Sequence, residues 1–179
     1  LILETRHWKT CIGYCFMLLE TNRLLIERFK NSDVHDWAKI ENDADVRRFV
    51  DGRVLSSEEA AEYVIMNIQH YRTHSYGRYA VRLKEKKILI GMCGFLDEPY
   101  GIDFGYRYSK DSWGKGLAFE AAKEVLNYGF LELGLDTVIG LTAEQNYGSI
   151  RILEKLNFKF EQKLLFNNTQ ALKYSYSGG

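Results

Sequence analysis

A glycine-rich turn that runs directly into an amphipathic helix constrains this chain most strongly. The turn is residues 113–116, Trp-Gly-Lys-Gly, and the helical pattern begins at Leu117. An apolar, aromatic run over residues 102–108 precedes the turn and is typical of a strand. The first N–H groups of a helix have no partner within the helix, and glycine lets a backbone approach a ligand closely. The pattern therefore predicts an anion site, with phosphate as the expected ligand.

The spacing of this turn differs from two well-known phosphate loops. A Walker loop needs four residues between its first glycine and its Gly-Lys-Ser/Thr end. The dinucleotide pattern Gly-x-Gly-x-x-Gly requires a third glycine where this chain has Phe119. Neither of these two nucleotide-binding patterns is therefore expected here.

Hydrophobic periodicity predicts one α/β domain with a mixed sheet of about seven strands. Ser56 and Glu59 form a capping box that opens one of the predicted helices. The strand at 102–108, the helix at 117–133 and a buried strand at 137–142 predict a right-handed βαβ unit. The other predicted strands are 23–29, 78–83, 88–96, 158–162 and 171–176, and the other helices lie near 34–40, 45–49, 56–68 and 148–156.

The loop resembles the pyrophosphate loop of the GNAT superfamily of N-acetyltransferases, Gln/Arg-x-x-Gly-x-Gly/Ala. Trp113 takes the first place of that pattern, as is common in the RimJ/RimL-type branch of ribosomal-protein N-terminal acetyltransferases. Residues 19–26 are similar to the opening strand of that branch. Residues 146–158 resemble its motif after the fifth strand, except that Asn157 replaces the usual glycine. The resemblance covers about residues 19–176.

The resemblance implies a single-domain, mostly antiparallel sheet with flanking helices and a splayed central strand pair. It divides the chain into an N-terminal extension at 1–18, an acetyltransferase domain at 19–176 and a flexible tail at 177–179. Acetyl-coenzyme A is the implied co-substrate. The residues implied to bind it are Tyr106, Arg107, Tyr108, Trp113, Gly114, Lys115, Gly116, Leu117, Ala118, Asn146 and Ser149.

Two residues are implied to be catalytic. Asp103 aligns with the glutamate that is the proposed base of the RimL type, although it is one methylene shorter. Ser149 is implied to hydrogen-bond the departing thiolate, with Tyr147 as the rival donor. Asn146 and Ser149 also suit an ordinary helix start. By resemblance alone, Trp37 is placed at the acceptor pocket.

Composition narrows the expected partners and location. The chain has 24 basic and 24 acidic residues, a formal net charge of zero, which argues against a broad nucleic-acid surface. The apolar run at 11–19 is too short to span a bilayer, so no membrane partner is expected.

Three cysteines without an even framework indicate a reducing compartment, and we expect a cytoplasmic protein. His7, Cys11 and Cys15 would share one face of a helix, but a zinc site needs a fourth ligand and local context. Packing is therefore favoured, and no metal is expected.

The resulting hypothesis is an enzyme that transfers acetyl from acetyl-coenzyme A to a primary amine by direct attack in a ternary complex. The expected acceptor is a protein N-terminal α-amine, and aminoglycosides and polyamines are the alternatives. A coenzyme-binding module without turnover is the alternative of another class. The expected oligomeric state is a monomer or a homodimer.

Overall fold

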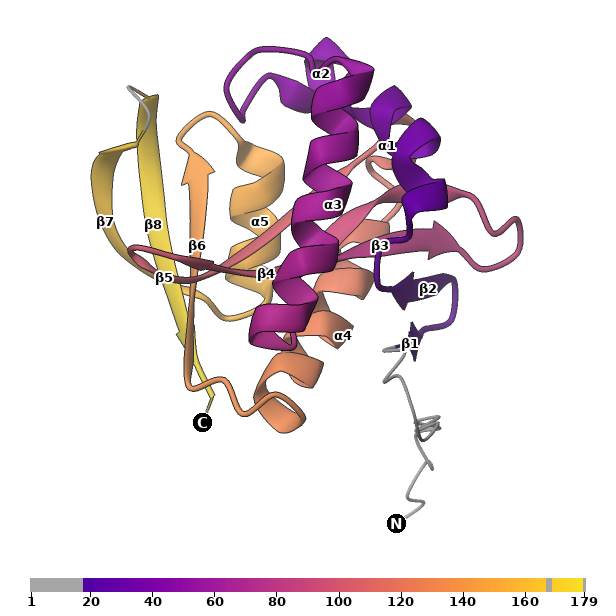
Figure 1. The fold of residues 1–179 in the computed structure, drawn as a ribbon. Coiled ribbons are helices and arrows are strands. Elements are labelled where there is room, and N and C mark those ends of the chain that lie inside the picture. Colours follow the sequence, from indigo (N-terminus) through magenta and orange to yellow (C-terminus); the bar gives the residue numbers. More distant parts are fainter. Residues whose placement is uncertain (1–17, 167–168, 179) are drawn as a thin grey trace.

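Eight strands build one continuous sheet in the computed structural model, which describes residues 18–166 and 169–178 (Figure 1). Their spatial order is β1-β2-β3-β4-β5-β6-β8-β7, and all neighbouring pairs are antiparallel except β5 and β6. The strands are β1 (Leu18–Glu20), β2 (Leu24–Glu27), β3 (Arg78–Leu83), β4 (Leu89–Glu98), β5 (Gly101–Tyr108), β6 (Thr137–Ala143), β7 (Lys159–Phe166) and β8 (Thr169–Ser177).

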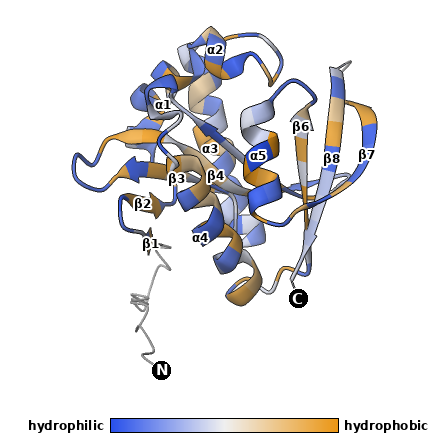
Figure 2. Cartoon of the chain, turned by 180° about the vertical axis from the view of Figure 1, so that it is seen from behind, coloured by the Kyte–Doolittle hydropathy of each residue, from blue (hydrophilic) through white to orange (hydrophobic). Residues whose placement is uncertain are grey.

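Five helices, counted over the described residues, cover the two faces of this sheet. Helices α1 and α3 lie over one face, with α2 beyond one end of α3 (Figure 1). Helices α4 and α5 lie on the opposite face (Figure 2). Short 3-10 turns occupy Asn31–Asp33 and Lys110–Ser112. The helices are α1 (Val34–Glu41), α2 (Ala44–Arg47), α3 (Ser57–His74), α4 (Leu117–Leu131) and α5 (Tyr147–Lys155).

Local signals in the sequence account for where these helices begin and end. The Ser56 hydroxyl accepts from the N–H of Glu59 and the Glu59 carboxylate accepts from the N–H of Ser56, so the predicted capping box opens α3. Gly134 follows α4 with a φ of 67°, a conformation that glycine adopts without strain. Asn157 follows α5 with a φ of 66°. Asparagine tolerates this region better than most residues, so it can replace the usual glycine there.

The hydrophobic core lies on both faces of the central strands. Val81 on β3, Phe95 on β4 and Phe104 on β5 are almost completely buried. Val125 of α4 and Val64 of α3 are also fully buried. Each of these helices turns one apolar side to the sheet, and burial of this apolar surface is the main stabilising contribution to the fold.

The mixed α/β architecture is confirmed, with eight strands where about seven are expected. The additional strand is β1, whose three residues pair with β2. Residues 1–17 of the expected N-terminal extension, including His7, Cys11 and Cys15, lie outside the described residues. At the other end, Ser177 of the expected tail is the last residue of β8 and pairs with Thr137. None of the helices within the described residues has both the length and the apolar character needed to cross a membrane.

Candidate functional site

The glycine turn enters α4 through two residues in a left-handed backbone conformation. Gly114 and Gly116 have φ angles of 71° and 74°, which residues with side chains rarely adopt. Gly116 is the N-cap residue of α4, and no side-chain hydrogen bond caps that end of the helix. The first N–H groups of α4 therefore remain available to an anion, and the loop fits a phosphate group.

The turn between β1 and β2 supports this loop from the side. Glu120, in the first turn of α4, accepts hydrogen bonds from the Thr21 hydroxyl at 2.6 Å and from the Arg23 Nε at 2.7 Å. Arg23 Nη1 donates to the carbonyl oxygen of Lys115 at 2.9 Å. Burial alone would raise the pKa of Glu120, but these hydrogen bonds lower it below its ordinary value. Glu120 is therefore a charged anchor that ties the β1–β2 turn to the loop.

Trp113 ties the loop to the end of β5. Its indole Nε1 donates to the carbonyl oxygen of Tyr108 at 2.9 Å, while 43% of the residue stays exposed. Lys115 is exposed, and the carbonyl of its own peptide is held by Arg23. Trp113 thus holds the loop in place relative to the strand.

Strands β5 and β6 separate after a single paired position. Eight residue pairs join β4 to β5, but only Asp103 and Ile139 are paired between β5 and β6. Beyond Asp103, the β6-facing edge of β5 is unpaired as far as Tyr108. The expected splayed central pair is therefore present, and it opens toward the glycine loop.

Backbone alternation identifies which groups of β5 face this gap. The N–H of Ser109 donates to the carbonyl oxygen of Ile90 on β4 at 2.8 Å. Because successive residues of a strand direct their backbone groups to opposite sides, the peptide groups of Tyr106 and Tyr108 point toward β6. Those of Arg107 point toward β4. The main chain of Tyr106 and the N–H of Tyr108 are therefore available to an extended ligand in the gap, whereas the Tyr108 carbonyl oxygen accepts from Trp113.

Asp103 lies at the closed end of the gap and is engaged in an ion pair. Its carboxylate is bound by the Arg78 guanidinium, and the two side chains are only 13% and 6% exposed. The charge of Asp103 also acts on the nearby phenol of Tyr100, whose pKa is raised by burial first and by this carboxylate second. The position of the Asp103 carboxylate is thus fixed by its ion pair with Arg78, in a partly buried site.

Ser149 and Tyr106 meet on the face of the sheet that α5 covers. The Ser149 hydroxyl lies 3.0 Å from the Tyr106 hydroxyl, which also donates to the Ser149 carbonyl at 3.1 Å. Asn146 is the N-cap of α5, and its side-chain oxygen accepts from the N–H of Ser149 at 3.2 Å. Tyr147 is 68% exposed. Burial raises the pKa of Tyr106 well above its ordinary value, so its phenol stays protonated at neutral pH.

Arg107 points to the opposite face of the sheet, toward α1. Both carboxylate oxygens of Glu41 lie 2.6 Å from its Nη1, and Glu41 also accepts from Arg47 at 2.5 Å. The expected acceptor residue Trp37 is fully buried here, stacked on Tyr63 with the Arg107 guanidinium 6.0 Å from its ring. Trp37 therefore packs behind Arg107 and does not line an open surface.

Among the residues that the structure describes, no nucleophilic cysteine is available at this site. Cys93 on β4 is a completely buried free thiol, and burial raises its pKa to about 12. A neutral thiol is a poor nucleophile at neutral pH. Within the described residues, no group of three or more His, Cys, Asp or Glu side chains is arranged to hold a metal ion.

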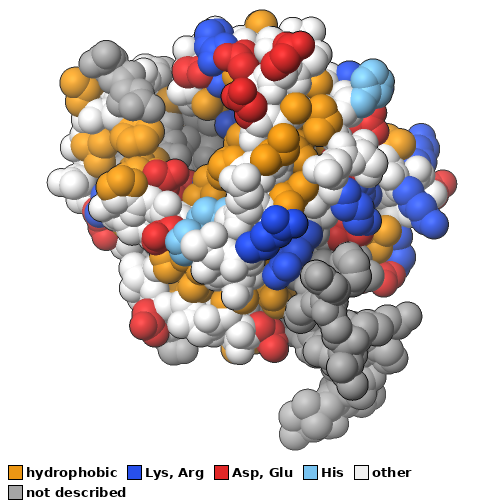
Figure 3. Space-filling model, viewed as in Figure 1, with side chains coloured by type: hydrophobic (Ala, Val, Ile, Leu, Met, Phe, Trp, Pro, Cys, Tyr) orange, Lys and Arg blue, Asp and Glu red, His pale blue; other side chains and the backbone are white. Residues whose placement is uncertain are grey.

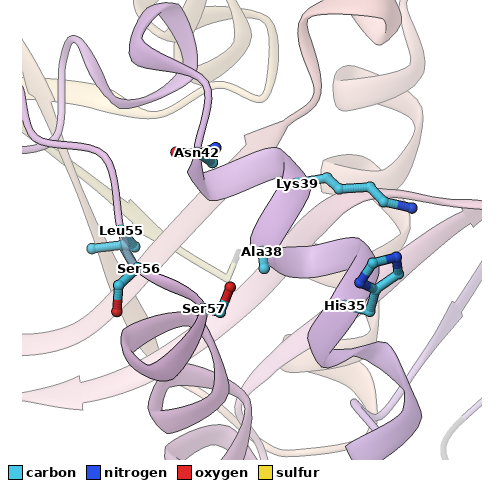
Figure 4. Close-up of a pocket in the computed structure, with 7 residues that line it drawn as sticks. All are labelled: His35, Ala38, Lys39, Asn42, Leu55, Ser56 and Ser57. Atoms are coloured by element: carbon cyan, nitrogen blue, oxygen red, sulfur yellow. The ribbon is translucent and has the colours of Figure 1, made fainter.

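The surface is hollowed on the face that carries α1 and α3, between the C-terminal strands and α3 (Figure 3). A separate pocket lies between α1 and the start of α3 (Figure 4), lined by His35, Ala38, Lys39, Asn42, Leu55, Ser56 and Ser57. None of these seven residues belongs to β5 or to the glycine loop, and the Ser56 hydroxyl is already used to cap α3. We therefore place the candidate site at the splayed strands.

Sequence patterns alone do not point to the roles of Arg78, Glu41, Arg23 and Glu120. The Arg78–Asp103 pair spans 25 residues, and the Arg23–Glu120 pair spans 97. No local pattern reports contacts over such separations. The buried charges become recognisable only when the strands and helices are placed side by side.

Comparisons with known proteins agree on one family. The family model "Acetyltransferase (GNAT) domain" matches residues 23–159. The "uncharacterized N-acetyltransferase p20" of Bacillus licheniformis is 28% identical over 147 residues, which cover 80% of this chain and 83% of that protein. A solved acetyltransferase (GNAT family) from Bacillus anthracis has a TM-score of 0.79 at 25% identity and covers 90% of this chain and 98% of its own.

RimL, a ribosomal L7/L12 alpha-N-protein acetyltransferase solved in complex with coenzyme A, has a similar fold. The alignment has a TM-score of 0.79 and covers 90% of this chain and 98% of RimL. At 16% identity, this similarity concerns the fold alone.

Proposed function

The chain belongs to the acetyltransferase (GNAT) domain family, and from this premise we propose that it transfers the acetyl group of acetyl-coenzyme A to a protein N-terminal α-amine. The observation that carries the proposal is the unpaired edge of β5 leading directly into the uncapped N-terminus of α4. An extended arm can pair with such an edge as an added strand, and a pyrophosphate suits such a helix start.

In this proposal, backbone groups hold the coenzyme. The N–H groups of residues 114–118 bind the pyrophosphate, and Lys115 adds positive charge. The main chain of Tyr106 and the N–H of Tyr108 bind the pantetheine arm, while Arg107 and Trp113 keep the strand and the loop in place. Asn146 contributes indirectly, because it caps α5 beside the gap. When bound, acetyl-coenzyme A supplies the activated acetyl thioester.

Asp103 is the proposed base for the acceptor. Only a neutral amine can attack, and an α-amine titrates near ~8 whereas a lysine amine titrates near ~10.4. Arg78 binds Oδ2 of Asp103, and the carboxylate accepts the amine proton directly or through water. As the new C–N bond forms and the C–S bond breaks, the proton leaves the nitrogen toward this carboxylate. Direct attack requires no covalent acetyl-enzyme.

Ser149 is the proposed donor to the departing sulfur. Its hydroxyl and that of Tyr106 form a hydrogen-bonded pair beside the gap. A thiolate that leaves between β5 and β6 takes a hydrogen bond from this pair, which stabilises the charge that develops on sulfur. The Tyr106 phenol stays protonated over the neutral pH range. When its single proton turns to the Ser149 Oγ, the Ser149 hydroxyl can direct its own proton to the sulfur.

The charges around Asp103 and Glu41 favour an acceptor that carries one positive charge over a polycation. Asp103 is paired with Arg78, and Glu41 is paired with both Arg47 and Arg107. These carboxylates are already neutralised, so they offer little attraction to an aminoglycoside or a polyamine.

The experiment is an acceptor screen in which the free thiol released from acetyl-coenzyme A is measured. We expect release with peptides that carry a free α-amine. We expect far less with N-terminally blocked lysine peptides, polyamines or aminoglycosides. Coenzyme binding without thiol release for any amine would contradict the proposal and indicate a binding module.

Asp103→Asn tests the base within the same assay. We expect kcat to fall by ~10²–10⁴-fold, the usual contribution of a positioned base. The affinity for acetyl-coenzyme A, measured by calorimetry, should stay close to that of the wild type. A full rate across the pH profile would show that another group or water takes the proton.

A further inference from the structure

Arg78 reaches across three strands of the sheet to the candidate base. It starts β3, and its guanidinium Nη1 donates to the carbonyl oxygens of Gly94 on β4 and Asp103 on β5, the latter at 3.0 Å. Its Nη2 binds the Asp103 carboxylate. The guanidinium therefore holds both the main chain and the side chain of the same aspartate.

Glycine at position 105 makes room for this guanidinium. A Cβ atom at Gly105 would lie 2.8 Å from Arg78 Cζ, closer than real contacts allow. Gly105 shares its side of β5 with Asp103 and Arg107, because residues two apart in a strand face the same way. The guanidinium therefore occupies the surface of β5 between these two side chains, on the side where α1 and α3 lie.

The main chain of Arg78 is fixed as firmly as its side chain. Its N–H donates to the side-chain oxygen of Asn67 on α3 at 3.0 Å. Its carbonyl oxygen accepts from the hydroxyl of Tyr71, also on α3. Since both ends of the residue are held, Arg78 can define the position of Asp103 closely.

We propose that Arg78 is the positioning residue for Asp103, and that it aims the Asp103 carboxylate at the acceptor amine. This inference rests on the proposed function, in which Asp103 accepts the amine proton. An aspartate is one methylene shorter than a glutamate, so its reach depends on where the strand and carboxylate are held. Arg78 holds Oδ2 and the local main chain, and the carboxylate also accepts from the Tyr100 phenol. A carboxylate has about four lone-pair sites, so it can still accept the proton. Arg78 itself touches no reacting atom.

If the Arg78–Asp103 ion pair were purely structural, its loss would have a different effect on the rate. Such a pair would support the fold, and its loss would lower stability without acting through Asp103. A positioning residue acts only while Asp103 is present to be positioned. The two roles therefore differ in a double-mutant cycle measured on the rate.

The experiment measures kcat, both KM values and thermal stability for Arg78→Met, Asp103→Asn and the double variant. Arg82→Met is the matched control. Arg82 lies four residues along the same strand and makes ion pairs with Glu27 at 2.8 Å and Asp33 at 2.5 Å, away from Asp103. Arg78→Lys keeps the positive charge but lacks the planar guanidinium with its several N–H donors. It is the conservative variant if Arg78→Met folds poorly. Calorimetric titration with acetyl-coenzyme A counts the folded sites.

We expect Arg78→Met to lower kcat by about 10- to 100-fold, as a small misplacement of a reacting group does. The KM for acetyl-coenzyme A should change little, and Arg78→Lys should recover part of the rate. In the Asp103→Asn background, the same substitution should have almost no further effect on kcat. Arg82→Met should lower stability and leave kcat per folded site near the wild-type value.

Other results would overturn the inference in distinguishable ways. An unchanged kcat in Arg78→Met, or an equal fall in both backgrounds, would show a structural pair only. An unchanged kcat in Asp103→Asn would show that Asp103 is not the base and that Arg78 has no positioning role. The proposal of acetyl transfer would not be affected by this result. Failure of the wild type to use any amine would instead contradict the proposed function.

Discussion

At the residue scale, Asn146 and Ser149 stand at the start of the same helix and use their side chains differently. The Asn146 side chain caps α5 by accepting from the N–H of Ser149. The Ser149 hydroxyl instead lies 3.0 Å from that of Tyr106. In the structure, Asn146 is therefore the cap and Ser149 is the proposed donor. The sequence pattern alone is compatible with either role for either residue.

Ser149→Ala should therefore lower kcat and kcat/KM together, because it removes an interaction made mainly in the transition state. Its effect on the melting temperature should be small, since the cap is intact. Asn146→Ala is the matched comparison, and its loss of the cap should cost about 0.5–2 kcal/mol of stability. Thiol-release kinetics and thermal unfolding of both variants check the prediction. An unstable Ser149→Ala with a normal rate would contradict it.

At the scale of elements, the strand–loop–helix unit combines a backbone requirement with a binding role. Gly116 has a φ of 74° and caps α4 without a side chain. Gly134, beyond the other end of α4, has a similar φ of 67° and no atom within 4 Å of an added Cβ. The two glycines pose the same conformational demand, but only Gly116 lies at the proposed phosphate site.

Gly116→Val should weaken acetyl-coenzyme A binding by at least about 10-fold, which corresponds to 1.4 kcal/mol. A β-branched residue resists the left-handed conformation, so the loop must shift away from the phosphate. Gly134→Val should lower the stability through the same backbone strain and leave the dissociation constant near the wild-type value. Calorimetry and thermal unfolding measure both. Equal affinities for the two variants would contradict a phosphate role for the loop.

At the scale of the whole molecule, ion pairs join segments that are distant in the chain. Glu27 on β2 contacts Arg82 on β3 at 2.8 Å and Lys30 at 2.9 Å. Burial alone would raise the pKa of Glu27, but hydrogen bonds from Lys30 and Arg82 lower it below 4.5. The pKa of Asp51 is lowered in the same way, with burial outweighed by Arg47. Glu120 adds a third such group at the glycine loop.

The pH dependence of stability follows from the direction of these shifts. A carboxyl whose pKa is lower in the folded state stabilises the fold above its unfolded pKa, and this stabilisation is lost as the pH falls through the folded pKa. The free energy of unfolding should therefore decrease as the pH falls from about 5 to about 3. Glu27→Gln should make this decrease smaller. Chemical unfolding at several pH values measures it, and an unchanged pH dependence in Glu27→Gln would contradict the assignment.

Local features of the fold and site could be predicted because they depend on neighbours in the chain. The capping box at Ser56, the strand before the glycine loop and the helix from Leu117 all lie where their patterns predict them. Strand β1 was missed because it is short and depends on pairing with β2. Trp37 was placed at the acceptor pocket by resemblance, whereas packing buries it completely.

By itself, the sequence determined the order of the elements and the glycine-rich entry to α4, because backbone preference and hydrophobic period act over a few residues. The resemblance of its motifs to known proteins indicated the family. Only the tertiary structure decided which buried charges meet. Register places Asp103 opposite Ile139 and lets Arg78 reach across β4 to it, and Gly105 leaves the space that the guanidinium fills. Contacts between residues far apart in the chain depend on strand register and packing, which short-range patterns do not contain.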